Sequence, residues 1–185
     1  MNVNKGGWAL GLMVLLVAAC SQQPDNRPLG DVVLRGAGCE LLAEQAVRLA
    51  TGVENLRFNG QLVHGRPFPK CEVYEKLGGV SEGDLLFAVD LQEPAMNTAE
   101  EEVSSRLKNG FPPIPADIGK GVSGSIRDSD DDQVIGMFAQ TYRGTRLLTI
   151  EIYKEAPGRD RKADAIEFLR QLGPVLLAQT STPAS

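Results

Sequence analysis

The stretch that decides the fold is residues 122–153, which read VSGSIRDSDDDQVIGMFAQTYRGTRLLTIEIY. Within it, three runs rich in apolar and β-branched residues are separated by polar, turn-forming segments: 122–127, 134–142 and 146–153. In the last run Leu148, Ile150 and Ile152 share one face, because successive side chains of a strand point to opposite sides. Three such runs joined by short turns predict consecutive hairpins and therefore an antiparallel sheet.

Outside this stretch the sequence predicts two more strands and three helices. Strands are expected at 71–75 and 85–91, where the residue pattern has a period of two. Helical spacing of apolar residues predicts helices at about 39–53, 98–109 and 160–172. The order α-ββ-α-βββ-α predicts an α+β fold, in which about three helices cover a mostly antiparallel sheet of about five strands.

Local signals mark where several of these elements begin and end. Gly52 is placed to end the first helix, and Thr98 with Glu101 has the pattern of a capping box at the start of the second. Gly173-Pro174 is expected to end or kink the last helix. Residues 55–70 contain glycines and prolines that suggest a loop, and the sequence leaves open whether they also contain a strand.

The N-terminal twenty residues have the composition of a lipoprotein signal peptide. Lys5 supplies a positive charge, and the apolar run that follows at 8–17 is too short to cross about 30 Å of hydrocarbon as a helix. The run leads into Leu16-Val-Ala-Ala-Cys20, which resembles the bacterial lipobox. This resemblance implies cleavage before Cys20, diacylglycerol on its sulfur and often an amide-linked third chain. Two acyl chains hold a protein stably on a membrane.

These features predict one domain behind a lipid anchor. The expected organisation is a cleaved signal peptide at 1–19, a flexible tether at 20–38, a globular α+β domain at 39–178 and a disordered tail at 179–185. An ordinary secreted protein with a chance cysteine at position 20 is the alternative. The net charge of −5 argues against nucleic-acid binding, which needs a basic surface.

The three cysteines fit an extracytoplasmic compartment. If Cys20 carries lipid, Cys39 and Cys71 remain as an even pair in an oxidising environment. A bridge between them would close a loop of about thirty residues and contribute roughly 3.7 kcal/mol by the chain-entropy estimate. A redox or metal role is the alternative, but the chain contains one histidine, which makes a zinc site a poor fit.

Glycines at 119, 121 and 124 match the pattern G-x-G-x-x-G. The dinucleotide-binding form of this pattern follows a strand and opens a helix. Here the glycines follow a proline-rich loop and are expected to open a strand, so we interpret them as a turn and strand edge. Ser123 lies in a near match to a nucleophile elbow, in which Ser125 replaces the final glycine.

Asp128, Asp130 and Asp132 have the one-three-five spacing of a calcium loop. An EF-hand next requires glycine and, at position twelve, a glutamate, whereas this chain has Gln133 and Ala139. The pattern therefore excludes an EF-hand. A solvated hairpin turn is the preferred interpretation, and a weak calcium site of another kind is the alternative.

The remaining polar candidates do not form a catalytic pattern. His64 is interpreted as an ordinary loop residue, because a general base or metal ligand needs partners that the sequence does not supply. The run Glu100–Glu102 is interpreted as the solvated start of a helix, where negative charge is favourable. No metal, no cofactor and no catalytic residues are predicted.

Two cysteine contexts and the order of elements resemble a known family. Cys39-Glu-Leu-Leu, Cys71-Glu-Val-Tyr and a proline-rich loop into Ile118-Gly119-Lys-Gly121 resemble the small actinobacterial lipoproteins of the DUF3558 type, over residues 38–178. Tyr74 stands where that family often has an aromatic residue, whereas Gly119-Lys-Gly121-Val departs from its expected turn. The resemblance implies an envelope lipoprotein with a Cys39–Cys71 bridge, and it brings no catalytic residues.

The sequence therefore predicts a non-enzymatic binding or accessory module on the extracytoplasmic face of the cell membrane. Its partner is expected to be an envelope protein. The sheet face or the loop Phe111-Pro112-Pro113-Ile114 is the candidate contact surface. A carrier of a lipid or other hydrophobic ligand is the first alternative, and an uncharacterised envelope enzyme is the second.

Overall fold

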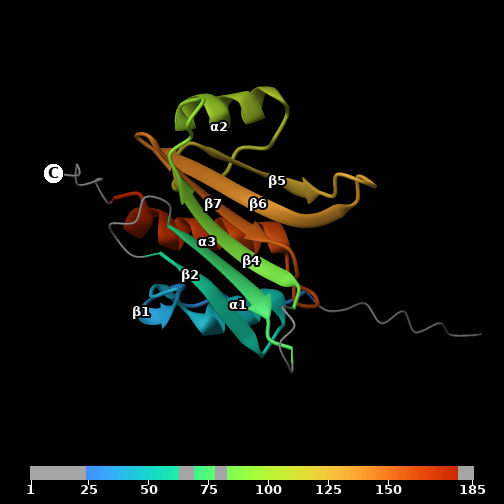
Figure 1. The fold of residues 1–185 in the computed structure, drawn as a ribbon. Coiled ribbons are helices and arrows are strands. Elements are labelled where there is room, and N and C mark those ends of the chain that lie inside the picture. Colours follow the sequence, from blue (N-terminus) through green and yellow to red (C-terminus); the bar gives the residue numbers. More distant parts are fainter. Residues whose placement is uncertain (1–23, 63–68, 78–82, 179–185) are drawn as a thin grey trace, which may run out of the picture.

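An antiparallel sheet of six strands, in the order β2-β3-β4-β7-β6-β5, forms the centre of the protein (Figure 1). The structure is a computed structural model that describes residues 24–62, 69–77 and 83–178. The sheet strands are β2 (Leu56–Gln61), β3 (Lys70–Glu75), β4 (Leu85–Gln92), β5 (Gly121–Arg127), β6 (Val134–Arg143) and β7 (Arg146–Ile152). The other elements are β1 (Val33–Gly38), α1 (Glu44–Thr51), α2 (Ala99–Lys108) and α3 (Arg161–Leu176).

The two faces of the sheet are covered differently. α1 and α3 lie behind the sheet in Figure 1, and their apolar side chains form the main core with Phe87, Val89, Leu148 and Ile150. On the other face, α2 covers the β5–β6 end through a small cluster: Ala99, Val103, Val122, Phe138 and Leu147. Within the described part of the chain, the rest of that face has no helix over it (Figure 1).

The predicted α+β class is confirmed, with three helices among the described residues and a mostly antiparallel sheet. The predicted strands at 71–75, 85–91, 122–127, 134–142 and 146–153 all form, within a residue or two at their ends. The capping box also forms: the Thr98 hydroxyl accepts from the Glu101 amide, and the Glu101 carboxylate accepts from the Thr98 amide. These elements were predictable because each has a strong period or a specific cap.

The region 55–70 contains a strand that the sequence did not resolve. β2 occupies Leu56–Gln61 and pairs with β3, with Gly60 opposite Cys71. A Cβ on Gly60 would stand 2.1 Å from the carbonyl oxygen of Lys70, and φ at this position is 102°. The glycine that suggested a loop is therefore the residue that lets two backbones approach within a sheet.

The first helix is shorter than predicted, because it begins at Glu44 and not at Cys39. Cys39 and Glu40 have φ angles of 49° and 67°, which place them in a tight left-handed turn. This turn joins β1 to the residues that follow it, since the Leu34 amide donates to the carbonyl of Leu41. The helix does end as predicted, with Gly52 in the left-handed conformation.

The last helix continues past the predicted stop. α3 runs to Leu176 through Gly173 and Pro174, and Leu172 and Leu176 are both fully buried. Pro174 lies in the last turn, where the loss of one backbone N–H donor costs a single hydrogen bond. Burial of the apolar residues on both sides of it keeps the helix intact.

The predicted tether over 20–38 is wrong for its C-terminal part. Leu29 and Val32 are 5% and 0% exposed and belong to the main core. The Asp25 amide donates to the carbonyl of Gly158 at 2.8 Å, so the ordered domain reaches back to residue 25. The polar and turn-rich composition concealed this, because a few apolar anchors in an irregular segment give no periodic signal.

Candidate functional site

One side of the sheet carries charged and aromatic side chains where no helix of the described chain covers it. We call this surface the polar sheet face, and it consists of Lys70, Glu72 and Tyr74 on β3, Ala88 and Asp90 on β4, and Thr149, Glu151 and Tyr153 on or just after β7. Opposed residues of antiparallel strands point to the same face. These residues alternate with the buried apolar residues of the main core, so they point away from α1 and α3.

Two glutamates flank the small side chain of Ala88 on this face. Glu72 is opposite Ala88 on one side, and Glu151 is opposite it on the other. Each glutamate accepts a hydrogen bond from the tyrosine two residues later, Tyr74 at 3.1 Å and Tyr153 at 2.9 Å. The same Glu-x-Tyr arrangement therefore occurs on both sides of β4.

Burial and charge shift the ionisation of this cluster. The Lys70 ammonium lies 2.7 Å from Glu72 and holds the pKa of that carboxyl below its usual range. Burial raises the pKa of Tyr153, and the neighbouring carboxylates Glu151 and Glu72 add to the effect. The pKa of Asp90 is raised chiefly by burial. A carboxylate that ionises at a cost within the fold is a group whose charge a bound cation can stabilise.

Asp90 stands in a row of polar groups that runs across the sheet. Lys70 is opposite Asp90, Asp90 is opposite Thr149, and Thr149 is opposite Gln140 on β6. Thr149 and Gln140 are 9% and 1% exposed. The hydroxyl oxygen of Thr149 and the amide oxygen of Gln140 are buried and have no hydrogen-bond partner among the described residues. Buried polar atoms normally have partners, so a hydrogen bond to these two oxygens from water or from a bound group would complete the site.

α2 forms a wall at one end of the face. Its Glu102 accepts from the Gln140 amide nitrogen at 3.2 Å, and also binds Arg106 at 3.2 Å. The Arg106 guanidinium lies over the Phe138 ring, 5.0 Å from its centre. At the other end of the face, the Arg57 guanidinium lies 5.1 Å from the centre of the Tyr74 ring.

A second concave feature lies on the opposite side of the molecule, between α3 and the N-terminal residues 25–30. It is an open cavity of about 650 Å³ with mixed charged and apolar walls. Arg159 lies beneath it, binds Asp164 at 2.6 Å and donates to the carbonyl of Arg27 at 2.9 Å. Gln171 donates to the carbonyl of Gly30. The polar groups of this cavity are thus used to hold the N-terminal segment on α3.

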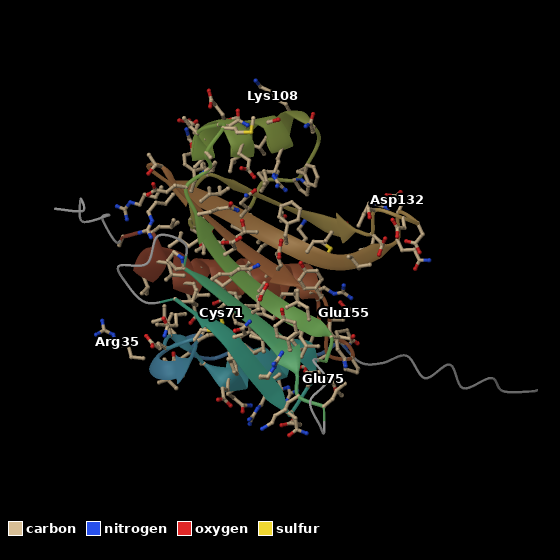
Figure 2. All side chains as sticks on the ribbon, in the orientation of Figure 1. Arg35, Cys71, Glu75, Lys108, Asp132 and Glu155 are labelled. Carbon is tan, nitrogen blue, oxygen red and sulfur yellow. A yellow bond between two sulfur atoms is a disulfide. The ribbon has the colours of Figure 1, made fainter. Side chains whose placement is uncertain are left out.

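The predicted disulfide is present, and it joins Cys39 to Cys71. The cysteines are separated by 32 positions, and their Cα atoms are 5.9 Å apart. Cys71 is fully buried in β3, and Figure 2 labels it on the sheet. The bridge ties the turn after β1 to the third strand, so its role in this structure is to close the N-terminal part of the core.

The loop Phe111–Ile114 lies along the edge of β5. The Ile114 amide donates to Gly121, and Pro112 accepts from the Ser123 amide at 2.9 Å. Phe111 packs against Phe138 with ring centres 5.6 Å apart, Ile114 is buried, and Pro112 and Pro113 are exposed. These contacts pair the edge of β5 with the chain's own loop, which protects it from other strands. A binding role for this loop stays a prediction.

The remaining sequence motifs have structural positions in the fold. Gly121 and Gly124 lie inside β5, so the glycine pattern opens a strand as expected. The Asp128–Asp132 turn forms the tip of the β5–β6 hairpin, where Figure 2 labels Asp132. There the Asp128 carboxylate accepts from the Asp130 amide, and Arg127 binds Asp132. Among the described residues, no group of three His, Cys, Asp or Glu side chains is placed to hold a metal ion.

Two predicted positions, Cys20 and His64, lie outside the described residues. In the part of the chain that the structure describes, no helix has the length and apolar character needed to span a membrane. Comparisons with protein-family models, curated proteins and solved structures found no match. The lipobox and the resemblance to the DUF3558-type lipoproteins therefore stay predictions.

Sequence reasoning named a sheet face as a candidate contact surface but did not identify the residues that form it. Its residues come from strands that are remote in sequence, and each strand alone shows an ordinary alternation of apolar and polar positions. A signal was present in the repeated Glu-x-Tyr of Glu72/Tyr74 and Glu151/Tyr153, and in Asp90 within an otherwise apolar strand. The pairing of β4 with both β3 and β7 brings these signals together.

Proposed function

We propose that this chain is a membrane-anchored extracytoplasmic lipoprotein whose domain binds an envelope protein through the polar sheet face. The observation that carries the binding role is the uncovered face itself, with half-buried Asp90 and the unpartnered oxygens of Thr149 and Gln140 within the described part of the chain. Tyrosines are enriched at protein interfaces, and buried polar atoms normally have hydrogen-bond partners.

The Cys39–Cys71 bridge supports the proposed extracytoplasmic location, because structural disulfides persist outside the reducing cytosol. Asp25 is already bound to the domain, and it lies five positions after Cys20. An extended chain of that length spans at most about 18 Å. Lipid on Cys20 would therefore hold the domain close to the membrane. The N-terminal segment lies on the α3 side, which leaves the polar sheet face free for a partner.

Two observations support protein binding over a hydrophobic carrier. The space between sheet and helices is filled by packed side chains, with Phe87 and Phe168 ring centres 4.6 Å apart. The cavity beside α3 has mixed charged and apolar walls and is open to solvent, so it does not enclose an acyl chain.

The enzyme alternative has one observation in its favour. The pKa values of Glu72 and Asp90, on adjacent strands, are shifted in opposite directions, as an acid and a base require. Catalysis also needs a site that encloses its substrate. Glu72 and Asp90 lie on the sheet side opposite α1 and α3, where no helix among the described residues covers β3 and β4. Binding is therefore the function that the geometry supports best.

The anchor is tested in the native host with Cys20→Ala. The wild-type chain is expected in the membrane fraction with the mass of an acylated N-terminal cysteine, and the variant is expected to lose both. Retention of an unacylated Cys20→Ala chain on the membrane would contradict the anchor.

The binding surface is tested by placing a photo-crosslinking amino acid at Asn59, which is exposed beside Glu72, and in parallel at Gln45, an exposed position on α1. Cross-linking in intact cells is expected to give a discrete protein adduct from Asn59 and none from Gln45. An adduct from Gln45 alone would place the contact on the other side of the domain, and lipid adducts from both would favour the carrier.

A further inference from the structure

The polar sheet face has an arginine at each end and hydrogen-bond acceptors between them. Arg106 and Arg57 already lie over aromatic rings at its two ends, on Phe138 and Tyr74. The strands between those rings are β4 and β7, which carry the carboxylates of Asp90 and Glu151. The face therefore holds guanidinium groups at both ends and acidic groups in the middle.

Among the described residues, the two central carboxylates have no cation within ion-pair distance, although the charge of Lys70 acts on both. Asp90 and Glu151 take part in no ion pair within the part of the chain that the structure describes, whereas Glu72 binds Lys70 and Glu102 binds Arg106. Glu151 uses one carboxylate oxygen for the Tyr153 hydroxyl. Its other oxygen and both oxygens of Asp90 have no hydrogen-bond donor from the side chains of the described residues.

The acceptors beside Asp90 extend the site toward α2. Directly opposed side chains in an antiparallel pair have Cβ atoms about 5 Å apart. Thr149 is thus within one side-chain length of Asp90, and Gln140 lies one strand further. Among the described residues their buried oxygens lack partners. The Gln140 amide oxygen can only accept a hydrogen bond, and the Thr149 hydroxyl can accept or donate one. A group with several donors in one plane fits this row better than a point charge.

We propose that the polar sheet face seats an arginine side chain of the protein partner on Asp90 and Glu151, and that side-chain shifts on binding open the neighbouring buried oxygens of Thr149 and Gln140 to its remaining N–H groups. A guanidinium has five N–H donors in a rigid plane, so it binds a carboxylate through two hydrogen bonds and keeps donors for neighbouring oxygens. Lys70 lies on the other side of Asp90 and opposes this binding by its charge. This inference rests on the proposed function, because it names the chemistry of the partner at the same face.

The test uses the mature chain and three short acetylated peptide amides that differ at one position: Gly-Arg-Gly, Gly-Lys-Gly and Gly-citrulline-Gly. Citrulline keeps the shape of arginine and removes its charge. Binding is followed by NMR shifts of the backbone amides and of the Gln140 side-chain amide. The arginine peptide is expected to shift Asp90, Thr149 and Gln140, with an affinity at least about tenfold above that of the citrulline peptide and above that of the lysine peptide.

Substitutions on and off the polar sheet face test whether arginine binds at Asp90. Asp90→Asn is expected to weaken arginine binding about tenfold or more, while Glu54→Gln, an exposed carboxylate off this face, leaves it unchanged. Lys70→Gln is expected to strengthen binding, which a variant that merely damages the fold would not do. Equal binding of the arginine and citrulline peptides, or shifts confined to residues around Arg159 and Arg170, would overturn the proposal.

The cross-linking and peptide-binding experiments can fail independently of each other. If Asn59 cross-links to a protein while the arginine peptide does not bind, the face binds a partner by other chemistry. If the peptide binds at Asp90 while Asn59 gives no adduct in cells, the site exists and the protein-binding role is wrong.

Discussion

The Arg159 guanidinium donates two hydrogen bonds, of 2.6 and 2.7 Å, to the Asp164 carboxylate, and both side chains are less than a tenth exposed. Arg159 also donates to the carbonyl of Arg27, so the same guanidinium joins α3 to the N-terminal segment. Through these contacts the pair holds residues 25–27 against the start of α3.

Arg159→Leu is expected to destabilise the protein by about 3–5 kcal/mol, because it leaves the Asp164 charge buried without its partner. Urea unfolding followed by circular dichroism measures the change. The double variant Arg159→Leu/Asp164→Leu is expected to recover part of the loss, since it buries no charge. A double variant that is less stable than the single one would mean that the pair does not act as a unit.

Removal of the disulfide by Cys39→Ala/Cys71→Ala is expected to lower the free energy of unfolding by roughly 3.7 kcal/mol, by the loop-entropy estimate. The bridge spans 32 positions and ties the segment around β1 to β3. Wild-type protein unfolded with a reductant present serves as the control and should show a similar loss. A change below about 1 kcal/mol would indicate that this segment is held by packing alone.

Two glycine substitutions are expected to act in opposite directions. At Gly124 a Cβ would lie 2.4 Å from the Phe111 ring and 2.9 Å from the Phe138 ring, so Gly124→Ala is expected to cost about 1–3 kcal/mol. Gly173 lies in α3, where an added Cβ would meet nothing within 4 Å, and Gly173→Ala is expected to add up to about 1 kcal/mol. Thermal unfolding of both variants checks this pair, and equal changes would contradict the packing described.

The stability of the protein is expected to depend on the ionisation of Asp90. Burial raises its pKa in the folded state above the ordinary value, so the folded state favours the protonated form. The contribution of Asp90 to the free energy of unfolding is therefore fully present below the ordinary carboxyl pKa of about 3.9. It is lost as the pH rises through the higher pKa that Asp90 has in the folded state.

Asp90→Asn is therefore expected to raise the melting temperature at pH 7 and to lose this advantage near pH 3. Glu54→Gln is the matched control and should shift little at either pH. A lower melting temperature for Asp90→Asn at pH 7 would mean that the ionised carboxylate stabilises the fold. The expected gain also separates binding from folding, because a variant that is more stable yet binds arginine less well has lost a recognition group.

Much of the fold was predictable from local patterns. The hairpin strands in residues 122–153, the helix cap at Thr98 and the stop at Gly52 each depend on neighbours in sequence, and all three are confirmed. The disulfide was predictable from the parity of the cysteines and is confirmed. β2 was not predictable. Gly60 lets the backbones of β2 and β3 approach closely, but in sequence it looks the same as a glycine that makes a turn.

The candidate site depended on topology, which local patterns do not contain. The polar sheet face appears when β4 lies between β3 and β7, and this brings Asp90 beside Thr149, nearly sixty positions away in sequence. The burial of Leu29 and Val32 was concealed for a related reason, since their partners are in α3 and the core. Sequence periodicity and helix caps predict single helices and strands. The residues that share a surface depend on which strands pair, and local patterns do not predict that.

We propose above that this chain is a lipid-anchored module that binds a protein. Native mass spectrometry of the mature protein, released from membranes of its own host under mild detergent, examines the anchor and the partner in one measurement. We expect a chain with acylated Cys20 and one disulfide, bound to a protein partner that dissociates when Asp90 is changed to Asn. A stoichiometric lipid or hydrophobic ligand that stays bound in the absence of any protein partner would contradict it and make the domain a carrier.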